Sequence, residues 1–218
     1  MERLLYISQT PHLENIRAAC EAGCRWIQLR VKQSRSKTGV QPEDDAQWVK
    51  DLLYNQQLEL AIDAKKICDE FGAKLSINDK PAIASQVNAY GVHVGKLDVP
   101  VVAARSIVGT QSCLGGTANT LDDVLAHIRD GVDYVGVGPF RFTTTKENLS
   151  PILGLEGYRQ LMTVIGNKVP VIAIGGILLE DIPALKETGV YGVAVSGLIT
   201  NTIDKKEMIQ KIKAIWNH

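Results

Sequence analysis

Short β-rich runs alternate with longer amphipathic stretches along the whole chain, and this alternation predicts repeated strand–helix units. Each run is short enough to be a strand buried in a parallel sheet. We predict eight strands, over residues 4–8, 26–31, 74–78, 91–94, 112–116, 134–138, 169–174 and 192–195.

Signals that start and stop helices lie between these strands. Thr120 stands three residues before Asp123, the spacing of a capping box. Three prolines stand where a helix could begin, at Pro11, Pro81 and Pro100. Glycines that could end the preceding helix stand before four strands, at Gly23, Gly72, Gly131 and Gly189. Connections of this kind suit parallel crossovers.

The number of units predicts the fold. Eight units in 218 residues average about 27 residues each, close to the minimum for a (β/α)₈ barrel. We therefore expect the α/β class and a TIM barrel, with residues 1–218 as a single domain. A doubly wound open sheet uses the same units, but no G-x-G-x-x-G sequence opens the first helix.

The composition is that of a globular protein, with 45% hydrophobic and 22% charged residues. Lys plus Arg and Asp plus Glu both number 24, so we expect no nucleic-acid or membrane partner and only a local anion site. No run reaches the roughly 18 apolar residues of a membrane helix and no signal peptide is visible, which favours the cytoplasm. Cys20 and Cys24 suit core packing better than a zinc site.

Polar side chains follow the second predicted strand. Gln28, Arg30 and Lys32 have a spacing of two, so they share one face of an extended chain. Barrel enzymes place their active sites at the carboxyl ends of strands, where these groups would meet an anionic or polar partner. An ion pair with acidic neighbours would explain them equally well.

Two aspartates follow neighbouring strands. Asp79 comes directly after Asn78, and Asp98 lies just past the fourth strand. Each stands two residues before a proline, so capping of the next helix is the alternative role. Two carboxylates on adjacent strand ends need a cation, and hard oxygen ligands near phosphates suit Mg²⁺. We therefore expect Asp79 and Asp98 to bind Mg²⁺.

Small residues follow the last two strands. Gly175 and Gly176 come after the seventh strand, and Ser196 and Gly197 after the eighth. Backbone amides at these two places could cradle a phosphate, although close helix packing would also require glycine. His93 is expected to be a hydrogen-bonded core residue without a catalytic role.

Two segments interrupt the regular spacing, residues 33–57 and 141–153. We expect both to overhang the carboxyl-end face. The first is either a polar loop that closes over an anion or a plain surface excursion. The second carries Thr143, Thr145 and Lys146, which could hold phosphoryl oxygens or simply form a turn.

Several motifs follow one another in order along almost the whole chain. They are Gln28-Leu29-Arg30-Val31-Lys32, Asn78-Asp79, Gly91-Val92-His93-Val94-Gly95 with Asp98, Gly136-Val137-Gly138-Pro139 with Thr143, Thr145 and Lys146, Gly154-Leu155-Glu156-Gly157, and Ala173-Ile174-Gly175-Gly176-Ile177. Together they resemble the thiamine phosphate synthase family, whose sister family is the thiazole tautomerases.

The resemblance implies a Mg²⁺-dependent transferase. Its substrates would be hydroxymethylpyrimidine pyrophosphate and hydroxyethylthiazole phosphate, and its products thiamine phosphate and pyrophosphate. Gln28 would contact the pyrimidine, and Asp79 and Asp98 would bind the metal. The pyrophosphate would be held by Arg30, Lys32, Asn78, Thr117 and Lys146. The thiazole phosphate would be held by Thr143, Thr145, Gly175, Gly176, Ser196 and Gly197. The chain could act as a homodimer.

The chain also departs from the family pattern. Val31 stands where an acidic residue is usual, Thr117 where a serine is usual, and Phe142 where a proline is usual. Lys96-Leu97 replaces Gln-Glu, and Ser196-Gly197 is shifted from the usual Val-Ser pair. Asn119 stands where the tautomerases carry their acid/base histidine, which counts against tautomerisation. A tautomerase-like paralogue and a non-catalytic thiamine-precursor binding protein remain the alternatives.

Overall fold

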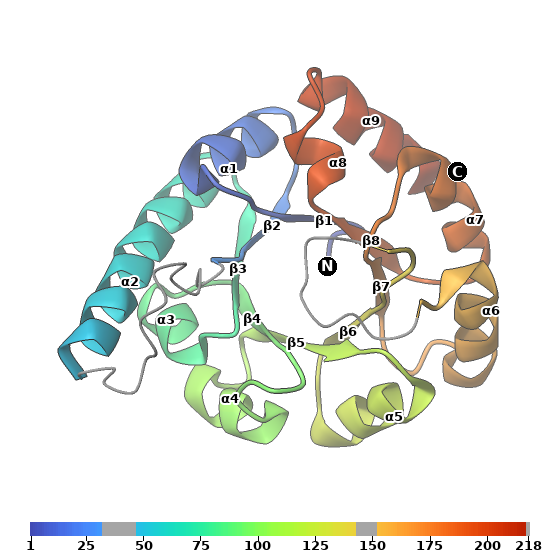
Figure 1. Cartoon of the computed structure of the whole chain (residues 1–218), viewed down its shortest axis with the longest axis horizontal. Coiled ribbons are helices and arrows are strands. Elements are labelled where there is room, and N and C mark those ends of the chain that lie inside the picture. The colour runs from blue at the N-terminus through green and yellow to red at the C-terminus, as the bar shows by residue number, and fades with distance from the viewer. Residues whose placement is uncertain (32–46, 143–151, 217–218) are drawn as a thin grey trace, which may run out of the picture.

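A computed structural model describes residues 1–31, 47–142 and 152–216. Its strands form a closed parallel barrel in chain order (Figure 1). They are β1 (Leu4–Ile7), β2 (Trp26–Leu29), β3 (Lys74–Asn78), β4 (Gly91–Val94), β5 (Cys113–Ala118), β6 (Tyr134–Val137), β7 (Val171–Ile174) and β8 (Gly192–Val195). The pairing of Leu5 with Ala194 closes the barrel between β1 and β8. The predicted (β/α)₈ barrel is therefore confirmed, and the open sheet is excluded.

Helices surround the barrel as an outer ring (Figure 1). They are α1 (His12–Glu21), α2 (Gln47–Glu70), α3 (Pro81–Gln86), α4 (Val101–Val108), α5 (Leu121–Asp130), α6 (Gly154–Ile165), the 3₁₀ helix η1 (Leu179–Asp181), α7 (Ile182–Glu187), α8 (Gly197–Thr200) and α9 (Lys205–Trp216). No described helix is both long and apolar enough to cross a membrane.

The helix α2 corrects the prediction of a loop over residues 33–57, since residues 47–57 are helical. Tyr54 and Leu58 pack against the core, and Ala61 one turn later is fully buried. This spacing of four and three residues belongs to a helix face. Residues 32–46, with Lys32, lie outside the described residues, as do Thr143, Thr145 and Lys146.

All eight predicted strands agree with the structure to within two residues at each end. The strand β5 extends further than expected, to Ala118, because Ala118 still pairs with Val137 of β6. The strand β7 begins only at Val171, since Pro170 before it has no N–H to donate to a ladder.

The predicted helix signals are confirmed. Thr120 Oγ1 accepts from Asp123 N at 3.2 Å, and the Asp123 carboxylate accepts from Thr120 N at 2.9 Å, which completes the capping box of α5. Pro81 is the first residue of α3, and Pro11 and Pro100 directly precede α1 and α4. Left-handed backbone follows four helices, at Gly23, Gly72, Gly131 and Gly189.

The hydrophobic core has two parts. The larger part lies between the barrel and the helices and contains the buried Cys20 and Cys24, which confirms their packing role. The smaller part includes Trp26 and Tyr134, whose rings meet edge to face at 5.0 Å between centroids. Trp26 Nε1 also donates to Ser76 Oγ at 2.9 Å. Aromatic side chains from strand starts thus help to fill the barrel interior.

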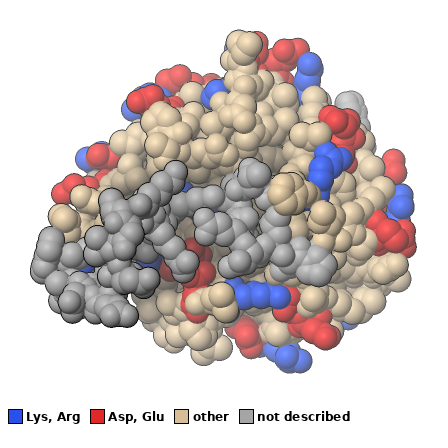
Figure 2. All heavy atoms as spheres, viewed as in Figure 1, with Lys and Arg blue, Asp and Glu red and all other residues tan. Residues whose placement is uncertain are grey.

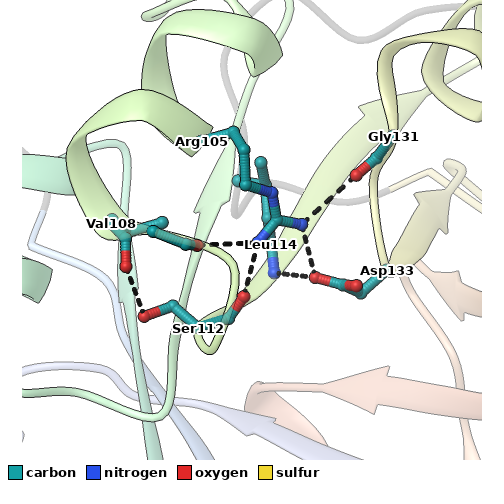
Figure 3. Close-up of polar contacts among 7 residues, drawn as sticks. Arg105, Val108, Ser112, Leu114, Gly131 and Asp133 are labelled. Carbon is teal, nitrogen blue, oxygen red and sulfur yellow. Dashed lines mark hydrogen bonds and ion pairs between the residues drawn. The ribbon is translucent and has the colours of Figure 1, made fainter.

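A clamp of polar contacts holds two helix-to-strand turns at the amino ends of β5 and β6 (Figure 3). Arg105 of α4 donates to Ser112 O at 2.7 Å, to Gly131 O at 3.2 Å and to the Asp133 carboxylate at 2.7 Å. The same carboxylate accepts from Leu114 N at 2.7 Å. A single guanidinium therefore joins the turn before β5 to the turn before β6.

Candidate active site

A cavity of about 950 Å³ opens at the carboxyl ends of the strands. On the described part of the face shown in Figure 2, acidic and basic side chains are mixed rather than gathered by sign. The described residues among the predicted site all line this cavity: Gln28, Arg30, Asn78, Asp79, Asp98, Thr117, Gly175, Gly176, Ser196 and Gly197. The structure thus brings together residues on or just after β2, β3, β4, β5, β7 and β8. The individual roles suggested for them stay predictions.

The two aspartates converge beside Gly95. A Cβ atom added to Gly95 would lie 2.5 Å from Asp98 Oδ2 and 3.9 Å from Asp79 Oδ1. Asp98 accepts from Gly95 N at 3.0 Å, and Asp79 accepts from the side-chain amide of Asn78. Neither carboxylate caps the helix that follows it, so the capping alternative is wrong.

The convergence changes the ionisation of Asp79. Burial, and then the hydrogen bond and negative charge of Asp98, raise the pKa of Asp79 to about 7, against the opposing charges of Arg30 and Lys80. At neutral pH this pair of carboxyls requires a shared proton or a bound cation.

The Asp79 and Asp98 carboxylates fit a Mg²⁺ ion whose other ligands are water and substrate phosphates. No group of three or more His, Cys, Asp or Glu side chains suited to a metal occurs in the described parts of the chain. Mg²⁺ is commonly held by one or two carboxylates, with water and substrate phosphates as its other ligands. Asp79 and Asp98 match that pattern, whereas a site formed entirely by protein ligands does not.

Gln28 is the clearest sign of a missing polar partner. Its side chain is 2% exposed, and its Nε2 has no hydrogen-bond partner among the described residues. A buried amide that lacks a partner costs stability, and Gln28 lines the cavity. It is therefore suited to donate a hydrogen bond to an acceptor on a bound molecule.

The opposite wall of the cavity contains the predicted glycine turn. Gly175 and Gly176 have φ values of 101° and 67°, which favour glycine. A Cβ atom on Gly176 would lie 2.7 Å from Phe142 O, so the backbone of the neighbouring loop also requires this glycine. The close-packing and ligand interpretations therefore both remain open here.

The Ser196 hydroxyl is already engaged in the fold. It donates to Ile7 O at 2.7 Å and accepts from Gln9 Nε2 at 2.9 Å. Its proton is thus committed, and the backbone of residues 196–197 is the part of this turn left to meet a ligand.

Sequence reasoning did not single out two cations of the cavity wall. Lys96 Nζ lies 2.5 Å from the Asp123 carboxylate, and Arg141 lies 2.8 Å from that of Asp181. Both residues line the cavity. Each lies just after the carboxyl end of a strand, as the predicted residues do. This position in the sequence could therefore have identified them.

His93 has the environment expected of it and one additional feature. It is 8% exposed, and its ring nitrogens lie 3.0 Å from the Tyr134 hydroxyl and 2.9 Å from Thr117 Oγ1. The prediction of a hydrogen-bonded core histidine is confirmed. His93 also reaches the cavity wall, which the sequence pattern did not show.

Comparisons with known proteins agree with this geometry. The family model described as thiamine monophosphate synthase matches residues 5–199. The thiamine-phosphate synthase of Flavobacterium johnsoniae is 44% identical over 217 residues, covering 96% of this chain and 94% of that protein. The thiamine-phosphate synthase of Phocaeicola vulgatus is 44% identical over 209 residues, covering 94% and 90%.

A solved structure gives the same result. The thiamine phosphate pyrophosphorylase from Pyrococcus furiosus superposes with a TM-score of 0.80 at 25% identity, covering 99% of this chain and 95% of that one. A 3-hexulose-6-phosphate synthase structure, at a TM-score of 0.69 and 14% identity, shares the fold alone.

Proposed function

The chain belongs to the thiamine monophosphate synthase family, and from this premise we propose that it is a transferase that makes thiamine phosphate. Its substrates are hydroxymethylpyrimidine pyrophosphate and hydroxyethylthiazole phosphate. The bond from the pyrimidine methylene carbon to the pyrophosphate oxygen breaks, and a bond from that carbon to the thiazole nitrogen forms.

The observation that carries the proposal is the Asp79–Asp98 pair in the cavity. Burial and the neighbouring Asp98 carboxylate together raise the pKa of Asp79 to about 7, and a divalent cation that arrives with a pyrophosphate would relieve both. Arg30 and Asn78 line the same side of the cavity and can contact the phosphate oxygens.

In the proposed mechanism the chain neutralises a leaving group. Asp79 and Asp98 would hold Mg²⁺, which when bound supplies positive charge to the pyrophosphate. Arg30 and the Asn78 amide add charge and hydrogen bonds at the oxygens, where negative charge grows as the carbon–oxygen bond breaks. Lys32 and Lys146, outside the described residues, are predicted to contribute in the same way.

Orientation is the second task of the cavity. Gln28 Nε2, which has no hydrogen-bond partner among the described residues, would donate to a ring nitrogen of the pyrimidine and so fix its orientation. The aminopyrimidine delocalises the positive charge left on the methylene carbon, so the reaction requires neither a covalent nucleophile nor a strong general base. Holding the thiazole nitrogen near this carbon then supplies much of the remaining rate enhancement.

The thiazole phosphate is assigned to the opposite wall, near Gly176 and the Ser196–Gly197 turn. Because the Ser196 proton is committed to Ile7 O, backbone amides rather than this hydroxyl would bind the phosphate. Thr143 and Thr145 remain predicted partners outside the described residues.

The tautomerase alternative has less support. Asn119 stands where those enzymes carry histidine, and its side-chain amide donates to Gly138 O. A carboxamide neither gains nor loses a proton to form an ion near neutral pH, so it cannot replace an imidazole as acid or base.

The direct test mixes both substrates with Mg²⁺ and the purified protein and measures thiamine phosphate and pyrophosphate by chromatography. We expect the two products in equal amounts, and loss of turnover when the metal is chelated. Asp98→Asn should also lose turnover. Asp69→Asn is the matched control for this variant, because Asp69 lies on the surface of α2 and pairs with Lys65.

Three results would contradict the proposal. Folded protein that forms no thiamine phosphate would rule out the synthase. Thermal stabilisation by either substrate without turnover would favour the non-catalytic binding protein instead. Turnover of the thiazole alone, indifferent to Asp98→Asn, would favour the tautomerase-like paralogue.

A further inference from the structure

Three side chains from neighbouring strands form a continuous line of hydrogen bonds that ends at the cavity. Tyr134 opens β6, His93 belongs to β4, and Thr117 lies on β5 between them. His93 Nδ1 lies 3.0 Å from the Tyr134 hydroxyl, and Nε2 lies 2.9 Å from Thr117 Oγ1. Tyr134 is 1% exposed, whereas His93 and Thr117 line the cavity. The line thus runs from an enclosed phenol to a hydroxyl that a ligand can reach.

Glycines make room for this arrangement. Gly115 pairs with His93 on one side and with Tyr134 on the other. A Cβ atom on Gly115 would lie 2.1 Å from Tyr134 Cζ, and one on Gly136 would lie 3.0 Å from His93 Cε1. The Trp26 ring packs edge to face on Tyr134. Packing therefore holds both rings in place, and the hydrogen-bond line is built into the barrel.

The direction of the protons along the line follows from burial. Burial holds the pKa of Tyr134 well above its usual value, so the phenol keeps its proton. A buried hydroxyl donates to an acceptor, and among the described residues its hydrogen-bond partner is His93 Nδ1. A neutral imidazole that accepts at Nδ1 carries its proton on Nε2, which then donates to Thr117 Oγ1.

This order leaves the Thr117 proton for another acceptor. We propose that Tyr134 and His93 are positioning residues that make the Thr117 hydroxyl a donor directed into the cavity, toward the pyrophosphate that leaves. The inference rests on the proposed function, because it takes pyrophosphate as the acceptor. A donor fixed in advance by the fold stabilises growing charge without reorganising during the reaction.

The opposite proton order would have the opposite effect. If His93 carried its proton on Nδ1, Nε2 would accept the Thr117 proton, and Thr117 would present only lone pairs to a phosphate oxygen. The Tyr134 hydroxyl thus decides whether Thr117 attracts or repels the anion. A role confined to packing would leave this choice unaffected.

The tautomer of His93 is measurable by ¹⁵N NMR on the whole protein labelled at histidine, with His93→Gln to assign the signal. We expect the Nε2–H form in the wild type and a shift toward a mixture of both tautomers in Tyr134→Phe. The matched control is Tyr158→Phe, which also removes a buried phenol, here one that donates to Val137 O. It should leave the His93 signal unchanged. An Nδ1–H form in the wild type would overturn the proposal.

Kinetics test whether the line acts through Thr117. We expect Tyr134→Phe to lower kcat by about tenfold with little change in KM, and Thr117→Ser to retain most activity. In a Thr117→Val background the Tyr134→Phe change should cost nothing further, since the hydroxyl it directs is gone. Losses that multiply in the double variant would show that Tyr134 does not act through Thr117.

The two proposals can fail separately. If the wild type makes no thiamine phosphate, the proposed function fails, while the NMR tautomer still tests the line of hydrogen bonds. In that case the calorimetric affinity for pyrophosphate with Mg²⁺ replaces kcat. A loss of affinity shared by Tyr134→Phe and Thr117→Val, and not additive between them, would support the positioning role, and independent losses would overturn it.

Discussion

Two aspartates at opposite ends of the barrel have opposite environments. Asp133, at the amino ends of β5 and β6, accepts from the Arg105 guanidinium and from Leu114 N. Asp79, at the carboxyl end of β3, is buried beside a second carboxylate, and burial and then this neighbour raise its pKa to about 7. The charge of Asp133 is thus matched within the fold, whereas Asp79 is left beside a like charge.

The difference shows how the fold divides stability from function. The polar groups of the Arg105–Asp133 clamp at the amino end are satisfied within the fold, so they stabilise the turns. Groups at the carboxyl end include the paired aspartates and Gln28 Nε2, which has no hydrogen-bond partner among the described residues. Both cost stability until a ligand or cation binds. Substitutions at the carboxyl end should therefore lower turnover more than stability, and substitutions in the clamp at the amino end should lower stability more than turnover.

The largest effect is expected from Asp79→Asn, which preserves shape and removes one charge of the pair. Turnover should fall by about a hundredfold or more, because charge that balances the leaving pyrophosphate is lost. The melting temperature should stay the same or rise, since a repulsion is removed. Asp98→Asn should behave alike. Steady-state kinetics and calorimetry measure both quantities, and a variant that mainly unfolds would contradict the assignment.

Arg105→Met should lower stability and leave turnover nearly unchanged, the reverse of the effect of Asp79→Asn. It leaves the Ser112 and Gly131 carbonyls and the Asp133 carboxylate without their donor, so unfolding free energy should drop by about 2–3 kcal/mol. The kcat of the folded protein should remain within about twofold of wild type, because the clamp lies at the end away from the cavity. Urea denaturation with parallel assays checks this, and a large loss of kcat in folded protein would break the division between the two ends.

The pH dependence of stability sharpens the comparison further. Because the pKa of Asp79 is raised to about 7, the folded metal-free protein keeps a proton between about pH 4 and pH 7 that the unfolded chain releases. Stability should therefore fall as pH rises through this window, by about 1–3 kcal/mol. Asp79→Asn should remove this dependence of unfolding free energy on pH. Added Mg²⁺ should restore the stability lost at pH 8 in the wild type and not in Asp79→Asn. Denaturation at pH 5 and pH 8 measures it, and a slope unchanged in Asp79→Asn would point to another group.

The smallest effect is expected from Thr120→Ala, which opens the capping box of α5. Although burial opposes it, the Lys96 ammonium and the N–H groups of Asn119 and Thr120 lower the pKa of Asp123 to about 2. Losing the Thr120 hydroxyl should cost about 1 kcal/mol, with activity nearly unchanged. A thermal melt measures this loss, and Thr163→Ala on the exposed face of α6 serves as a control for removing a hydroxyl.

Local patterns were sufficient to predict the barrel and much of its site. Thr120 and Asp123, and glycines such as Gly131, act within a few residues of themselves, so their roles are visible in sequence. The cavity residues after β2, β3 and β4 could be predicted because position at a strand end alone places a side chain on one face. The start of α2 was predicted wrongly, since residues 50–53 near that start are all exposed, and its leucines do not mark a buried helix face.

The sequence by itself therefore determined the succession of strands and helices and which end of the barrel holds the chemistry, because both depend on local periodicity. The sequence placed Asp79 and Asp98 at neighbouring strand ends, but only the tertiary structure decided that Asp79 is buried against Asp98 and that Gln28 Nε2 has no hydrogen-bond partner among the described residues. It alone also decided the line from Tyr134 through His93 to Thr117. These features depend on strand register and on space left by glycines such as Gly115, and such contacts between distant parts of the chain leave no periodic trace in the sequence.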